Sequence, residues 1–187
     1  RTAPSFLFES VENGDEVGRF SFLGAEPSLE VIAYENKVTV KNHIEGTQEQ
    51  YECKNPLQLV RELSEQWSIS EPVAVGEMPL PSFIGGWVGF AGYDTARYSE
   101  IDVLPFCNAP EDDRDLPDLH LALYKTIVIF DHVAKIVHVV HNSIIDHENK
   151  NPELAWEEAN IELDKVVTKL QSEGENIPVG TIEIDLS

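Results

Sequence analysis

The sequence predicts an α+β fold, built on antiparallel β-sheets with helices packed outside them. Short runs in which apolar and polar side chains alternate recur along much of the chain, and this alternation is the pattern of half-buried strands. Two other stretches carry apolar residues at helical spacing, and each begins with an Asn-Pro pair, which is typical of a helix start. With 187 residues, of which 42% are hydrophobic, the chain is long enough to bury the core of one domain.

Five strands are predicted in the N-terminal part, where they form an antiparallel meander. Their ranges are 5–9, 19–24, 29–34, 37–41 and 48–53. The dipeptide Glu35-Asn36 separates the third strand from the fourth and predicts a hairpin turn, because Asn tolerates the left-handed conformation that tight hairpins need.

Two helices are predicted, one after the meander and one near the C-terminus. The first starts at Asn55-Pro56, and its apolar stripe, which should pack on the sheet, consists of Leu57, Val60, Leu63 and Trp67. The second covers residues 152–174, with Asn151 as its cap and Gly174 at its end. Its inward-facing residues should be Ala159, Leu163, Val166 and Leu170.

The middle of the chain predicts three more strands. Residues 83–90 are rich in glycine, but they lack the spacing of a phosphate loop, so we interpret the glycines as places where another backbone approaches closely. Residues 119–131 predict one central strand that is buried on both faces at its end. Residues 135–141 should pair with it through a turn at 131–134.

Composition excludes several classes of function. The formal net charge is −21, with 34 acidic against 13 basic residues, so we expect no binding to nucleic acid or to an anionic membrane. Cys53 and Cys107 lack the spacing of a redox or zinc motif and are expected to be free thiols. No metal site is expected from the histidines, since His138 and His141 would face opposite sides of a strand. We expect a cytoplasmic protein, or one of the plastid stroma.

A charged and a polar residue end the first strand, which is otherwise apolar. Alternation places Glu9 on one side of a partly buried sheet and Ser10 on the other. A buried carboxylate needs a partner. For Glu9 this partner could be Arg19 on the next strand, which would make the pair structural, or the ammonium group of a small ligand, which would make it a binding site.

These residues belong to motifs that resemble the large subunit, component I, of anthranilate synthase, within the chorismate-utilising enzymes. The family has Leu-Leu-Glu-Ser followed by Arg-Tyr-Ser-Phe-Leu-Gly. The corresponding residues here are Leu7-Phe8-Glu9-Ser10 and Arg19-Phe20-Ser21-Phe22-Leu23-Gly24. The order and spacing also fit in Gly85-Gly86-Trp87-Val88-Gly89-Phe90-Ala91-Gly92-Tyr93-Asp94, Arg97, Glu100, Asp112-Asp113, Leu116-Pro117-Asp118 and Ile127-Val128-Ile129-Phe130-Asp131-His132.

The resemblance implies the N-terminal part of a four-layer enzyme that converts chorismate and glutamine-derived ammonia to anthranilate. It implies an N-terminal domain at residues 1–174 and a linker at 175–187 toward a C-terminal chorismate-binding domain, which would hold Mg²⁺. Without that catalytic half, we expect no catalysis and no cofactor in this chain. A glutamine amidotransferase subunit is the implied protein partner.

The same resemblance implies a feedback site for L-tryptophan on the signature strand. Ser10 and Glu9 are the first candidates for contact with the ligand, and Arg19 and Ser21 are weaker ones. No catalytic residue is expected here. Two alternatives stay open, namely the N-terminal part of aminodeoxychorismate synthase component I and a non-catalytic amino-acid-binding domain.

Overall fold

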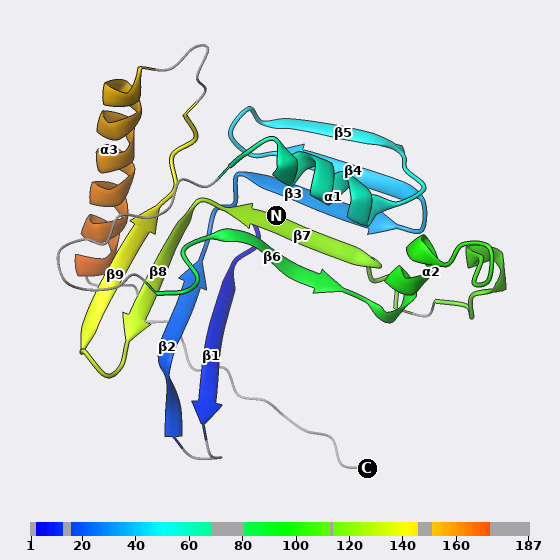
Figure 1. Cartoon of the computed structure of the whole chain (residues 1–187), viewed down its shortest axis with the longest axis horizontal. Helices are drawn as coiled ribbons and strands as arrows, with labels where there is room; N and C mark the ends of the chain where they lie inside the picture. Colours follow the sequence, from blue (N-terminus) through cyan, green and yellow to red (C-terminus); the bar gives the residue numbers. More distant parts are fainter. Residues whose placement is uncertain (1–2, 13–15, 69–80, 113, 146–150, 173–187) are drawn as a thin grey trace.

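The computed structural model describes residues 3–12, 16–68, 81–112, 114–145 and 151–172, without the side chains of residues 10–12, 16 and 17. The strands are β1 (Phe6–Glu12), β2 (Glu16–Gly24), β3 (Leu29–Tyr34), β4 (Lys37–Asn42), β5 (Thr47–Glu52), β6 (Gly86–Ala91), β7 (Leu119–Tyr124), β8 (Thr126–Asp131) and β9 (Ile136–His141). The helices are α1 (Pro56–Glu65), α2 (Ala96–Ser99) and α3 (Pro152–Gln171), with 3₁₀ turns η1 (Tyr93–Thr95) and η2 (Phe106–Asn108). The predicted α+β class is confirmed (Figure 1).

The described strands form two antiparallel sheets, with the orders β1-β2-β8-β9 and β5-β4-β3-β7-β6. The predicted meander is confirmed for β3, β4 and β5, but it is wrong for the first two strands. These form a hairpin in the other sheet, because the chain leaves the four-stranded sheet after Gly24 and enters the five-stranded one at Leu29. In the β3–β4 turn, the left-handed residue is Glu35, with φ 50°, and not Asn36.

Residues 119–131 form two strands, so the prediction of a single strand was wrong. The strand is interrupted at Lys125, so that β7 lies between β3 and β6 while β8 lies between β2 and β9. Each half is central in its own sheet, and that explains the apolar run over the whole stretch. The predicted pairing of β8 with β9 is confirmed.

Two hydrophobic clusters among the described residues form the core. In the first, Leu57, Val60 and Leu63 of the predicted stripe pack on the five-stranded sheet, as expected. Trp67 lies beyond the end of α1 and is not part of this cluster. Buried Val60 belongs to it with Val31, Val38 and Leu119. The second joins the two sheets. Its members from β6, β7, β8 and the β1–β2 hairpin include Val88, Ala122, Ile127, Ile129, Phe6 and Phe22.

Helix starts and the glycine-rich strand follow the sequence closely. Asn55 caps α1 by accepting a hydrogen bond from Gln58 N, and Asn151 caps α3 by accepting one from Glu153 N. Gly89 in β6 lies so close to the carbonyl of His120 that a Cβ there would clash with backbone, which confirms the predicted close approach.

Helix α3 lies beside β9 at the edge of the four-stranded sheet (Figure 1). Ala155 is buried, and Ala159, Leu163 and Val166 are partly buried, as predicted. Leu170 lines the space between the helix and the sheet on the predicted side, but it is 47% exposed. The predicted end of this helix at Gly174 lies outside the described residues. In the part of the chain that the structure describes, no helix is long and apolar enough to cross a membrane.

Candidate functional site

The predicted site residues lie on the β1–β2 hairpin, at an irregularity of its ladder. Glu9 pairs with Ser21, and the next regular pair is Val11 with Val17. Between these pairs, Ser10 alone on β1 faces Gly18–Phe20 on β2, so Arg19 is the middle residue opposite Ser10. Such bulges re-aim a side chain and are common beside functional sites. The backbone therefore brings all four predicted residues together, although the Ser10 side chain lies outside the described residues.

The predicted burial of Glu9 and its pairing with Arg19 are not what the structure shows. Glu9 is exposed. Arg19 pairs instead with Asp131 at the end of β8, where its Nη2 and Nε lie 2.9 and 3.3 Å from Asp131 Oδ2. Arg19 thus reaches Asp131 on β8, which is the other neighbour of β2, and not Glu9 on β1.

Asp131 connects Arg19 to the turn between β8 and β9. Its side chain is only 4% exposed, and its Oδ1 accepts hydrogen bonds from the backbone N–H groups of Val133 and Ala134. The hydrogen bond from Arg19, followed by that from Ala134, lowers the pKa of Asp131 to about 2. Asp131 is therefore ionised at neutral pH and holds the guanidinium, which lies 4.8 Å from the centre of the Phe20 ring.

Ser21 is bound to the same turn. It is 2% exposed, and its Oγ shares a hydrogen bond of 2.7 Å with His132 Nε2. The backbone N–H of His132 also donates to the carbonyl of Arg19. Ser21 is thus a supporting residue, and a ligand on the surface of the hairpin would not reach its hydroxyl.

Sequence reasoning missed Asp131 and His132 as parts of this site. Both belong to the motif 127–132, which pointed to the family but was interpreted only as a strand and its turn. Their separation from Arg19 by more than a hundred residues gave no local signal.

The site offers groups of opposite charge beside an apolar surface. Arg19 is 55% exposed although Asp131 holds it, so part of its guanidinium remains accessible to an anion. Glu9 presents an exposed carboxylate on the neighbouring strand. The half-exposed Phe8 ring contacts that of Phe6 on the same strand. A zwitterion with an aromatic side chain matches these groups in chemistry.

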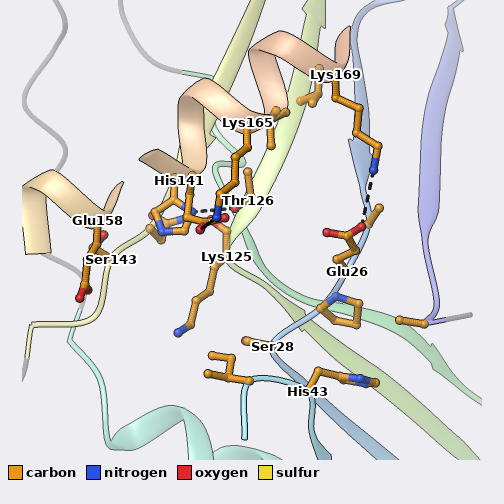
Figure 2. Close-up of a pocket in the computed structure, with 18 of the residues that line it drawn as sticks. Glu26, Ser28, His43, Lys125, Thr126, His141, Ser143, Glu158, Lys165 and Lys169 are labelled. Carbon is orange, nitrogen blue, oxygen red and sulfur yellow. Dashed lines mark hydrogen bonds and ion pairs between the residues drawn. The ribbon is translucent and has the colours of Figure 1, made fainter. Parts of the chain in front are cut away.

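Away from the hairpin, a cavity of about 1110 Å³ lies between α3 and the four-stranded sheet (Figure 2). Figure 2 shows Lys169 of α3 pointing toward Glu26, and His141 beside Thr126 beneath the helix. Lys169 Nζ lies 3.6 Å from Glu26 Oε1, and Thr126 shares a hydrogen bond with His141. Lys165 pairs with Glu162 on α3 itself. Burial lowers the pKa of His141, so this imidazole is neutral at pH 7. The cavity contains none of the predicted site residues, and its charges are largely paired.

Another buried carboxylate, that of Glu30 on the five-stranded sheet, is bound by neighbouring side chains. Glu30 Oε1 lies 2.8 Å from Lys41 Nζ, and its Oε2 lies 3.1 Å from His43 Nε2. Burial raises the pKa of Glu30, but the hydrogen bonds from Lys41 and His43 outweigh burial and lower it overall. His120 Nε2 lies at ion-pair distance, 3.3 Å, without hydrogen-bond alignment. Within the described ranges, no group of three or more His, Cys, Asp or Glu residues could hold a metal ion.

Comparison with known proteins gives a consistent result. No family model matches the chain. Anthranilate synthase alpha subunit 1 (chloroplastic) of Oryza sativa subsp. indica is 46% identical over 185 residues, which cover 97% of this chain and 31% of the relative. The protein of the same name from Arabidopsis thaliana is 51% identical over 144 residues, 75% of this chain and 24% of the relative. Anthranilate synthase component 1 of Acetivibrio thermocellus is 36% identical over 152 residues, with 81% and 28% covered.

A solved structure agrees with these relatives. The crystal structure of anthranilate synthase component I from Streptococcus pneumoniae matches with a TM-score of 0.57 and 25% identity, over 85% of this chain and 31% of that one. The chain thus spans about a third of the length of the proteins that it matches. On this similarity the chain is a homologue of anthranilate synthase component I, and it belongs to that family over the part of the family's length that it spans.

Proposed function

We propose that this chain is the N-terminal, regulatory portion of an anthranilate synthase component I. The parent enzyme would convert chorismate and glutamine-derived ammonia to anthranilate, in tryptophan biosynthesis. The observation that carries the proposal is the similarity to anthranilate synthases over nearly the whole chain, in plants and in bacteria. The relatives reported above all carry this name, which favours it over aminodeoxychorismate synthase and over a domain without an enzymatic partner.

The β1–β2 hairpin is the proposed feedback site for L-tryptophan. Glu9 would bind the ammonium group of the ligand, and Arg19 would bind its carboxylate, because each offers an exposed charge of the required sign. Ser10 would contact the ligand from β1, opposite Arg19. Ser21, which is buried against His132, would support the strand behind the ligand.

The remaining functions of the parent protein would lie outside this chain. A C-terminal chorismate-binding domain would contain the catalytic residues and Mg²⁺, and a glutamine amidotransferase subunit would supply ammonia. In this proposal residues 1–174 form the N-terminal domain, and residues 175–187 connect it to the catalytic domain. Several relatives are named chloroplastic, which supports a plastid location.

Calorimetric titration of L-tryptophan into the chain and into a Ser10→Phe variant tests the feedback site. We expect saturable binding to the wild type and loss of binding in the variant, because a phenyl ring opposite Arg19 would occupy the space of the ligand. Ser99→Phe, which places the same ring on an exposed serine at the end of α2, is the matched control and should bind normally. A wild-type chain that takes up no L-tryptophan would contradict the proposal.

A further inference from the structure

We propose that Asp131 is a positioning residue of this effector site, and that through Arg19 it sets the preference for ligands with a free carboxylate. The inference rests on the proposed function, because it assumes that the hairpin binds an amino acid. Asp131 itself would not touch the ligand. It lies at the end of β8, in the motif 127–132, which the sequence analysis did not assign to the site.

The two carboxylate oxygens of Asp131 accept hydrogen bonds from different partners. Oδ2 accepts from both Nε and Nη2 of Arg19, and Oδ1 accepts from the two turn N–H groups at 3.0 and 2.8 Å. The turn therefore fixes the carboxylate, and the carboxylate fixes the plane of the guanidinium. Nη1 has no hydrogen bond to any described residue, and the side chain is half exposed, so one end of the guanidinium faces outward.

A further argument is the backbone at the bulge. The regular ladder between β1 and β2 is interrupted opposite Ser10, and a long side chain at such a point would sample many rotamers. Here the His132 N–H binds the Arg19 carbonyl, while the His132 ring binds Ser21. The β8–β9 turn thus holds the backbone of Arg19 as well as its guanidinium.

The consequence for a ligand is preorganisation. An arginine that is already held pays less conformational entropy when it binds a carboxylate, and its planar fork is selective for that group. If Asp131 is changed, Arg19 keeps its charge but loses its fixed direction. The loss should then appear for ligands with a carboxylate and should be small for ligands without one.

The test compares L-tryptophan with tryptamine, which has the same indole and ammonium group but no carboxylate. Asp131→Asn keeps one oxygen for the two turn N–H groups and places a neutral amide against the guanidinium. We expect the ratio of the Kd of tryptamine to that of L-tryptophan to fall about tenfold in this variant, as for the loss of one charge-assisted hydrogen bond. Arg19→Met, which leaves the turn unchanged, should lower the ratio at least as much, and the double variant should lower it no further than Arg19→Met alone.

Asp94→Asn is the matched control, because it removes the carboxylate of another Asp–Arg pair, with Arg97, away from the hairpin. Its ratio should stay at the wild-type value. If the wild type binds L-tryptophan but Asp131→Asn and Arg19→Met both keep the full ratio, this inference and the assignment of the ligand carboxylate to Arg19 are overturned, while binding of L-tryptophan to the chain stands. If only Arg19→Met lowers the ratio, Arg19 binds the carboxylate without help from Asp131, and the inference is again wrong. No binding of L-tryptophan to the wild type would overturn both.

Discussion

At the scale of single residues, the ion pair between Arg19 and Asp131 is the main tertiary link of the candidate site. The aspartate is buried, and the arginine is half exposed. Four hydrogen bonds end on this one carboxylate, two from Arg19 and two from the turn, and they favour its charged form. The pair thus joins the second strand of the fold to its eighth.

This pair makes stability depend on acid pH. The pKa of Asp131 is about 2 in the folded chain, compared with 3.8 for an aspartate without these partners. The contribution of Asp131 to stability is therefore complete well above pH 4 and is lost as the pH falls from about 4 through about 2. Melting temperatures measured across this range should fall more for the wild type than for Asp131→Asn, and the gap between the two proteins should close toward pH 2. Parallel curves for the two proteins would show that the ion pair contributes nothing.

The same residues show what the sequence can predict. The motif correctly predicted the two strands of the hairpin on which the four candidate residues lie, because the strand and its spacing are local properties. That these residues bind a ligand stays a prediction. Of the two partners that the sequence left open for Glu9, the structure does not show Arg19, because Arg19 pairs with Asp131, which is 112 residues away. The irregularity in the ladder beside Arg19 likewise depends on how two strands pair. Periodicity along one strand contains no information on either point.

At the scale of elements, β6 and β7 approach each other very closely at Gly89. Gly89 stands opposite Leu121, and its Cα faces the carbonyl of His120 without room for a side chain. Gly89→Ala should therefore separate the edge strand β6 from β7 and destabilise the fold by ~3 kcal/mol, measured by urea unfolding. Gly92→Ala, for which the nearest atom to the new Cβ is 3.3 Å away, should cost clearly less. Equal costs at the two positions would contradict this reading of β6.

Helix α3 packs on the rest of the fold with few buried side chains. Ala155 is its one fully buried residue among the twenty that the structure describes, and the cavity of about 1110 Å³ lies beneath it. Regions with few buried contacts open locally at a lower free energy than the core. In hydrogen exchange, the amides of α3 should be protected at least about tenfold less than those of β7, whose strand is paired on both sides. Equal protection would mean that the helix is held by contacts beyond those described.

Sequence reasoning joined β7 and β8 into one strand. This error shows what the sequence pattern cannot predict at the scale of elements. Alternation and the apolar run correctly predicted strands over 119–131, but both strands are central, so nothing in the pattern changes at Lys125. Which sheet a strand enters is decided by its partners. By contrast, the starts of α1 and α3 were predicted to the residue, because an Asn cap followed by Pro acts within one turn.

At the scale of the whole molecule, charge is the dominant feature. A net charge of −21 on 187 residues repels itself in the compact state, and salt screens this repulsion. The melting temperature should rise as NaCl increases from 10 mM to 500 mM at pH 7. A fall over this range would show that screening weakens the ion pairs of Arg19, Lys41 and Arg97 more than it relieves the repulsion between carboxylates.

The position of β2 between β1 and β8 also has a consequence for folding during synthesis on the ribosome. Arg19 and its partner Asp131 are 112 positions apart, and translation adds about 5–20 residues per second, so about 6–22 s separate the synthesis of the two. During that interval the hairpin can close on itself, but Arg19, Ser21 and the Phe20 and Phe22 rings still lack the strand that orders them. The candidate effector site, although its hairpin is made well before β8, is thus among the later parts of the described fold to take its final form.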